Sequence, residues 1–163
     1  MYYDLVQLTD SHLLQDKEQN LNGVNTYQSL KQVLIQVQKH KVKHLLFSGD
    51  LAQDEKKSTY QHYLELTGNV KCPIYYIPGN HDNPTIMEKA LNQQSWSTSK
   101  YIDIYQWRII LLNSHYPGHT AGHLSGHECQ HLVNSLESWS GPVLIFLHHH
   151  LEPSIIYKGR DIS

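Results

Sequence analysis

The chain has 163 residues, of which 39% are hydrophobic and 17% are charged; this suits one folded domain and excludes a disordered chain. Its formal net charge of −2 excludes a broad basic surface for nucleic acid or for anionic membranes. The chain contains 13 histidines, an unusually large number, and none of them belongs to a terminal tag. Imidazole is the commonest metal ligand in proteins, so the positions of these histidines are informative.

Short apolar runs alternate with helical patterns along the chain. In chain order we predict a strand at 5–8, a helix at 26–40, a strand at 44–47, a helix at 58–66, a strand at 74–77, a helix at 84–91, a weaker strand at 101–105, a strand at 109–112, a helix at 125–139 and a strand at 143–147. Asn83 before Pro84 is typical of a helix start, and the Ser125–Glu128 spacing is typical of a capping box. This alternation predicts an α/β fold in a single domain spanning residues 1–163.

The N-terminus and the cysteines indicate a cellular setting. The N-terminus lacks the basic and apolar regions of a signal peptide, and runs such as 143–147 are too short to cross a bilayer. Cys72 and Cys129 match no zinc or disulfide spacing, which suits a reducing compartment. We therefore expect a cytoplasmic protein with no membrane partner.

Five of the predicted strands are followed by carboxylate, carboxamide or imidazole side chains. These side chains are Asp10 and His12, then Asp50, then Asn80, His81 and Asp82, then Asn113 and His115, and finally the three histidines at 148–150. In open α/β sheets the ligand site lies at the carboxyl ends of the strands. Turns alone would favour Gly, Ser and Pro, so the pattern predicts a functional site at these ends.

The donor types at these strand ends are typical of a metal site. Oxygen and nitrogen donors without thiolates suit Mn, Fe or Zn ions. Asp10 and His12 are two residues apart on a segment expected to be extended, so both can reach one ion. Gly49 allows a tight turn before Asp50, whose carboxylate can bridge two ions. Asn80 adds a neutral amide oxygen.

Four motifs together resemble a known family. They are Asp10-x-His12, Gly49-Asp50, Gly79-Asn80-His81-Asp82, and His148 within Leu147-His148-His149-His150. The chain is similar over nearly its whole length to the calcineurin-like metallophosphoesterases, and most similar to the bacterial class III 3′,5′-cyclic-AMP phosphodiesterases. The resemblance implies the N-terminal part of an αββα sandwich, in which mixed sheets are flanked by helices.

The resemblance also implies a site for two divalent or transition metal ions. Asp10, His12 and Asp50 would hold one ion, and Asp50, Asn80 and His148 the other. A hydroxide activated by the two metals would attack the phosphorus atom of a small phosphodiester, and 3′,5′-cyclic AMP is the substrate that the likeness favours.

The resemblance further implies roles around the substrate. Asn80 and His81 would contact it, and His81 would stabilise the transition state or protonate the leaving oxygen. Asp82 would orient His81; an equal alternative is that its carboxylate favours the start of the next helix. By strand alternation, His149 is expected to point away from His148 and not to bind metal.

One motif of the family falls outside this sequence. Members carry a Gly-His-x-His motif downstream of the fourth motif, and it is not among the 163 residues here. We therefore expect a domain that is C-terminally incomplete relative to the family. The alternative to an active enzyme is an inactive or self-associating fragment, and a homo-oligomer is one such form.

A competing motif is His127-Glu128-Cys129-Gln130-His131, which matches the HExxH pattern of zinc peptidases. A helical wheel predicts a buried apolar stripe on the side opposite both histidines. The stripe consists of Cys129, Leu132, Val133, Leu136 and Trp139. This favours a solvated histidine face over a peptidase site. The neighbouring segment 117–124 is rich in Gly and His and is predicted to be a loop at the rim of the site.

Overall fold

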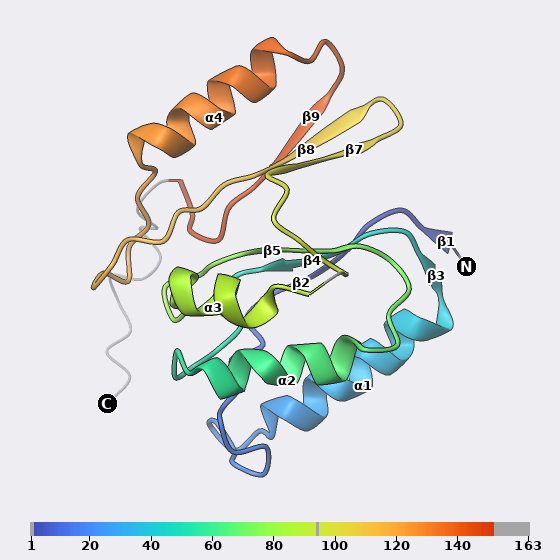
Figure 1. The fold of residues 1–163 in the computed structure, drawn as a ribbon, viewed down its shortest axis with the longest axis vertical. Helices are drawn as coiled ribbons and strands as arrows, with labels where there is room; N and C mark the ends of the chain where they lie inside the picture. Colours follow the sequence, from blue (N-terminus) through green and yellow to red (C-terminus); the bar gives the residue numbers. More distant parts are fainter. Residues whose placement is uncertain (1, 94, 152–163) are drawn as a thin grey trace, which may run out of the picture.

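A computed structural model describes residues 2–93 and 95–151 of the chain (Figure 1). The helices are α1 (Thr26–Lys39), α2 (Lys57–Thr67), α3 (Pro84–Leu91) and α4 (Gly126–Glu137). Helices α1 to α3 cover one sheet, α4 covers a second sheet, and the two sheets lie between these helical layers. The predicted α/β sandwich is confirmed.

The first sheet is parallel throughout and has the strand order β2-β4-β5-β6. Its strands are β2 (Val6–Leu8), β4 (Leu45–Ser48), β5 (Ile74–Ile77) and β6 (Trp96–Ser97). A separate parallel pair joins β1 (Tyr2–Tyr3) to β3 (Lys41–Val42). In the main sheet, Leu8 lies opposite Phe47, and Phe47 lies opposite Tyr76. The carboxyl ends of β2, β4 and β5 therefore lie side by side at one edge.

Asparagine caps fix the starts of two helices that cover this sheet. The Asn25 side chain accepts a hydrogen bond from the Gln28 N–H at the start of α1. The Asn83 side chain does the same for the Ile86 N–H, and Pro84 occupies the first turn of α3. The predicted α3 is confirmed with its cap.

The second sheet is mixed and has the order β7-β8-β9. Its strands are β7 (Tyr101–Ile104), β8 (Trp107–Leu111) and β9 (Val143–Phe146). Strand β7 runs antiparallel to β8, whereas β8 and β9 are parallel and are connected through α4. A parallel pair needs such a crossover, and α4 packs over the outer face of the sheet as a result (Figure 1).

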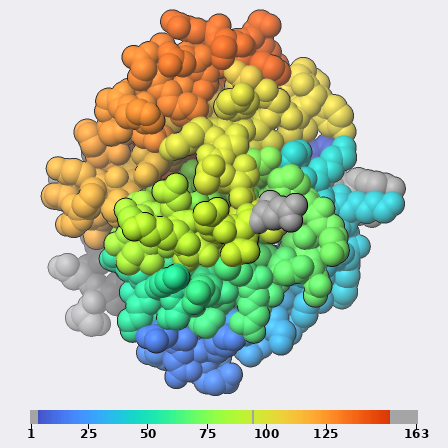
Figure 2. All heavy atoms as spheres, in the orientation of Figure 1, coloured from blue at the N-terminus to red at the C-terminus, as the bar shows by residue number. Residues whose placement is uncertain are grey.

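Two clusters of buried residues form the core. Strand β4 is buried on both faces, so its side chains alternate between the clusters: Leu45 and Phe47 face the helices, and Leu46 faces the second sheet. The cluster between the sheets consists of Leu46, Tyr75, Ile77, Ile102, Ile109 and Leu111. Because the sheets share this cluster, β9 is held close to the ends of β4 and β5. The space-filling view places α4 and the α1–α2 layer at opposite ends of the molecule (Figure 2).

The prediction of a buried apolar stripe on α4 is wrong. The buried residues of this helix are Glu128 and Ser135, whereas Cys129, Val133 and Leu136 are exposed. Ser125 caps the helix as predicted, but the Glu128 carboxylate does not complete a capping box, because it accepts from the Asn113 N–H and pairs with Lys100. Large apolar side chains are exposed on both α4 and β9, namely Val133, Leu136, Leu144 and Ile145.

Both cysteines are free thiols, in agreement with their spacing. Cys72 is buried under the first sheet, and burial raises the pKa of its thiol. Among the described residues, the helices lack the combination of length and apolar character that crossing a bilayer requires.

Candidate metal centre

The strand ends of both sheets meet at one place. Asp10 and His12 follow β2, Asp50 follows β4, and His81 follows β5. His148 comes from the second sheet, after β9, and its Nδ1 lies 3.0 Å from the Ser48 carbonyl oxygen at the end of β4. The sandwich thus brings five of the predicted side chains to a common site.

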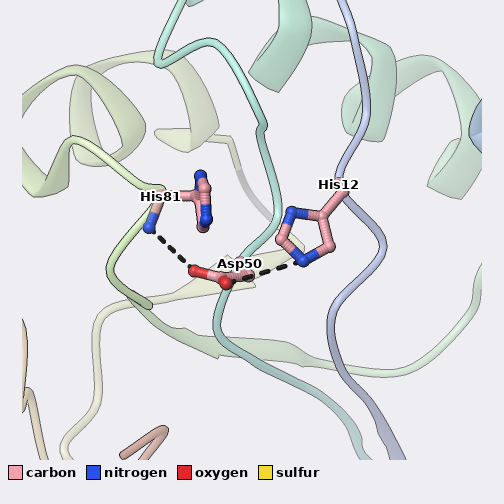
Figure 3. Close-up of side chains that lie close together, drawn as sticks. All are labelled: His12, Asp50 and His81. Carbon is pink, nitrogen blue, oxygen red and sulfur yellow. Dashed lines mark hydrogen bonds and ion pairs between the residues drawn. The ribbon is translucent and has the colours of Figure 1, made fainter. Parts of the chain in front are cut away.

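Asp50 lies at the centre of this site, as Figure 3 shows for three of the residues. Its Oδ2 lies 3.5 Å from the Nε2 of His12 and 3.5 Å from the Nε2 of His148. Its Oδ1 accepts a hydrogen bond of 2.9 Å from the backbone N–H of His81. The Asp10 carboxylate lies 3.7 Å from the same His12 nitrogen. A buried carboxylate therefore faces imidazoles from three separate segments.

Two groups of possible metal ligands share Asp50. One consists of His12, Asp50 and His81, and the other of Asp10, Asp50 and His148; within each group the ligand atoms lie within 4.8 Å of one another. The two groups are also joined by the 3.7 Å contact between the Asp10 carboxylate and His12 Nε2, so the five side chains form one continuous cluster. The Asn80 amide belongs to the turn beside them.

The backbone at the site is unusual. Asp10, His12 and Asp50 have φ angles of 53°, 42° and 52°, in the left-handed region that non-glycine residues rarely adopt. The expectation that Asp10 and His12 lie on an extended segment is therefore wrong, since β2 ends at Leu8. The two side chains nevertheless lie close together, with the Asp10 carboxylate 3.7 Å from the Nε2 of His12. Such strained residues cluster at functional sites.

Two glycines allow the chain to approach these ligands closely. Gly49 has a φ of 105°, and a Cβ atom there would overlap the His148 ring. A Cβ on Gly79 would overlap the Asp50 carboxylate. Only glycine leaves room at both positions, so the Gly-Asp and Gly-Asn-His motifs are a steric requirement of this packing.

The charges at the site suit a cation. Burial opposes ionisation of Asp50, but hydrogen bonds from His148 and the His81 backbone outweigh it, so the pKa of Asp50 lies below its ordinary value. Hydrogen bonding to Asp50 raises the pKa of His148. The Nδ1 of His12 is buried without a hydrogen-bond partner in residues 2–93 and 95–151. Clustered carboxylates and imidazoles with an orphaned nitrogen fit a divalent metal ion.

Gln53 is a further residue of the site that the motifs did not predict. It lies three residues after Asp50, in the same loop. Its side-chain Nε2 lies 3.2 Å from the Nδ1 of His81. The His81 ring also packs edge-on against His12, with centroids 5.1 Å apart. These contacts fix the plane of the His81 ring. With Asn80, His81 lines a pocket of about 300 Å³ whose other wall is formed by residues 117–120.

Asp82 has a different environment from the one expected of a partner for His81. Its buried carboxylate accepts hydrogen bonds from the backbone N–H groups of Leu51, Ala52 and Gly79 and from the Tyr60 hydroxyl. Burial nevertheless raises the pKa of this carboxyl. These bonds tie the turns after β4 and β5 together. They favour a structural role for Asp82 over the predicted catalytic one.

The HExxH motif does not form a metal site in the part of the chain that the structure describes. Its glutamate, Glu128, is 7% exposed and pairs with Lys100 at 2.6 Å. His127 is 86% exposed, and His131 lies against the Lys100 carbonyl oxygen at 3.3 Å. Neither histidine belongs to a described group of metal-capable side chains. The arrangement gives the peptidase alternative no support.

Comparisons with known proteins agree with this geometry. The family model for calcineurin-like phosphoesterases matches residues 3–162. The 3′,5′-cyclic adenosine monophosphate phosphodiesterase CpdA of Escherichia coli (strain K12) is 36% identical over 154 residues, covering 92% of this chain and 56% of the relative. CpdA of Haemophilus influenzae is 36% identical over 158 residues with the same coverage. The 3′,5′-cyclic-nucleotide phosphodiesterase alr5338 of Nostoc sp. is 32% identical over 154 residues, covering 89% and 56%.

A helix–sheet–sheet–helix sandwich with carboxylates and imidazoles at its strand ends defines a metallophosphoesterase domain. The chain belongs to the calcineurin-like phosphoesterase family. It spans about half the length of the curated relatives that it matches.

Proposed function

We propose that this chain belongs to a metal-dependent phosphodiesterase that hydrolyses 3′,5′-cyclic AMP. The observation that carries the proposal is that one carboxylate, Asp50, belongs to both groups of possible metal ligands. A carboxylate common to two sites would let both ions be held near one another, which would favour in-line displacement at phosphorus. The names of the relatives from Escherichia coli and Haemophilus influenzae support the choice of substrate.

The ligand assignment remains the one that the motifs suggest. We assign Asp10, His12 and Asp50 to one ion, and Asp50, Asn80 and His148 to the other. Divalent ions of the Mn, Fe or Zn type held by these residues would lower the pKa of a nucleophilic water and would offset charge on the phosphate. The position of His148, held against Ser48 and Asp50, supports its inclusion. Asn80 is included because it precedes His81 in the turn that lines the pocket.

His81 is assigned to the leaving group. Its ring is held by Gln53 through Nδ1, so the opposite nitrogen, Nε2, is left to act on substrate. An imidazole there can donate a hydrogen bond or a proton to the departing ribose oxygen. Asn80 lines the same pocket, which supports its proposed contact with the substrate.

The test is turnover of 3′,5′-cyclic AMP by the chain after reconstitution with Mn²⁺, Fe²⁺ or Zn²⁺. We expect His81→Ala to lower kcat by about a hundredfold, the usual contribution of a positioned acid, while the bound metal stays constant. His127→Ala is the matched control, because this histidine is exposed on α4. A chain that holds two ions and does not hydrolyse the cyclic nucleotide would contradict the proposed function.

Self-association is a second candidate, and the exposed apolar side chains of α4 and β9 favour it. Val133, Leu136, Leu144 and Ile145 are 40–45% exposed, and β9 is an edge strand of its sheet within the described residues, where a second copy could pair. We expect the chain to form dimers or larger species at micromolar concentration, and Leu144→Lys with Val133→Lys to restore the monomer mass in light scattering. The control is Lys39→Glu at the end of α1. A monomer at all concentrations would exclude this candidate.

A further inference from the structure

The loop at residues 114–123 is closed and internally packed. The Ser114 carbonyl oxygen accepts a hydrogen bond of 2.9 Å from the His123 N–H, which brings the two ends of the loop together. Within it, the Tyr116 ring stacks on His119 with centroids 4.2 Å apart, and the His119 N–H bonds to the Tyr116 carbonyl. A compact surface loop with adjoining ends and its own side-chain packing is an Ω-loop, a type that is frequently functional.

This loop forms one wall of the pocket beside the metal centre. His115 and residues 117–120 line the pocket, opposite Asn80 and His81. A substrate whose phosphate lies at the metal centre would therefore place its remaining part against the loop. The position of the loop is then a determinant of how well that part binds.

His149 connects the loop to the strand that carries a metal ligand. Its Nδ1 lies 2.8 Å from the Ser114 hydroxyl, and its backbone N–H also faces that oxygen at 3.4 Å. Ser114 and His149 are 1% and 9% exposed. At the other end of the loop, a Cβ on Gly122 would overlap the His149 side chain, so the Gly122 backbone rests on the ring. His149 thus contacts both ends of the loop.

The other side of the His149 ring faces the metal centre. It stands at 88° to the His148 ring, with centroids 5.0 Å apart. Its Nε2 is buried and has no hydrogen-bond partner in the described chain, and His149 belongs to neither ligand group. The prediction that His149 points away from His148 is wrong, because both residues lie beyond the end of β9 and their rings are in contact.

We propose that His149 is a positioning residue that anchors the Ω-loop 114–123 beside the metal centre and so sets the wall against which the nucleoside part of the substrate binds. The anchor itself follows from the contacts of Ser114, Gly122 and His149, and only its consequence for substrate rests on the proposed function. A buried hydrogen bond at one end and close backbone packing at the other hold a loop better than either contact alone.

The first test is amide hydrogen exchange of the metal-free chain. His149→Leu removes the bond to Ser114, and the His123 amide is expected to exchange about tenfold faster while strands β4 and β8 keep their protection. His149→Asn places an amide near the position of Nδ1 and should restore slow exchange. Ser114→Ala removes the same bond with a smaller change and serves if His149→Leu does not fold. His150→Leu, at the exposed neighbouring position, is the control.

Two results would overturn the anchor: unchanged exchange of the His123 amide in both His149→Leu and Ser114→Ala, or an equal increase in the exchange rates of β4 and β8.

The second test compares 3′,5′-cyclic AMP with methyl p-nitrophenyl phosphate, which has no nucleoside. His149→Leu is expected to raise KM for the cyclic nucleotide about fivefold more than KM for the small ester. Equal changes would overturn the role of the loop as a substrate wall. Absence of turnover in the unmodified chain would count against the proposed function alone, because the exchange result decides the anchor.

Discussion

Asp50→Asn is expected to remove both metal ions and to lower phosphodiester turnover by more than about a hundredfold. Substitution of a residue that only supports a metal ligand typically costs up to about a hundredfold, and loss of the ligand itself should cost more. The reason is that Asp50 is common to both ligand groups, so one substitution weakens both sites. Asparagine has nearly the same shape and can still accept from the His81 N–H, which limits the effect on folding. The loss should therefore come from the missing charge.

The measurement is the metal content of dialysed protein by mass spectrometry, together with turnover and the melting temperature. Asp16→Asn is the control, because Asp16 is exposed and lies outside the site. We expect the Asp50 variant to melt within a few degrees of the unmodified metal-free chain. If it retained two ions per chain, Asp50 would not be the shared ligand.

Asp82→Ala is expected to destabilise the fold by about 4 kcal/mol, because buried donors that lose their acceptor each cost about 1–3 kcal/mol. The donors in question are the N–H groups of Leu51, Ala52 and Gly79. A loss of this size is a large part of the stability of an ordinary domain. The stability of Asp82→Asn should lie between that of the unmodified chain and that of Asp82→Ala, since one carboxamide oxygen replaces two carboxylate oxygens.

Urea denaturation of the metal-free chain measures this effect, with Asp16→Ala as the matched control. The outcome separates the two roles of Asp82. A residue that only orients His81 would leave the free energy of unfolding nearly unchanged and would lower kcat. If Asp82→Ala unfolded at the same urea concentration as the unmodified chain, the structural role assigned here would be wrong.

Most of the fold could be predicted from local patterns. The four helices and the longer strands follow from apolar periodicity and from the caps at Asn83 and Ser125. The strands β1, β3 and β6 have two residues each, too few to show any period. The predicted burial of α4 failed because a helical wheel shows which side chains share a face but not what covers that face. Here the Lys100 and Asn113 segments cover the polar side.

The candidate site was predictable in its members and less so in its geometry. Carboxylates and imidazoles at the ends of parallel strands had to meet, because β2, β4 and β5 are neighbours. The left-handed backbone at Asp10 and His12 depends on the path of the chain after β2, which residue types alone do not specify. The contact of Gln53 with His81 and that of His149 with Ser114 arise from tertiary packing, and no local pattern marks them.

The left-handed residues at the metal centre have a consequence for the evolution of this domain. Conformations of this kind cost about 1–3 kcal/mol each, and Asp10, His12 and Asp50 all adopt them. Glycine would relieve the strain at each position, but it would delete the ligand. Substitutions that stabilise the fold here therefore work against its chemistry, and the domain is subject to a trade-off between stability and activity at these three residues. Variants selected only for thermal resistance should lose these side chains first.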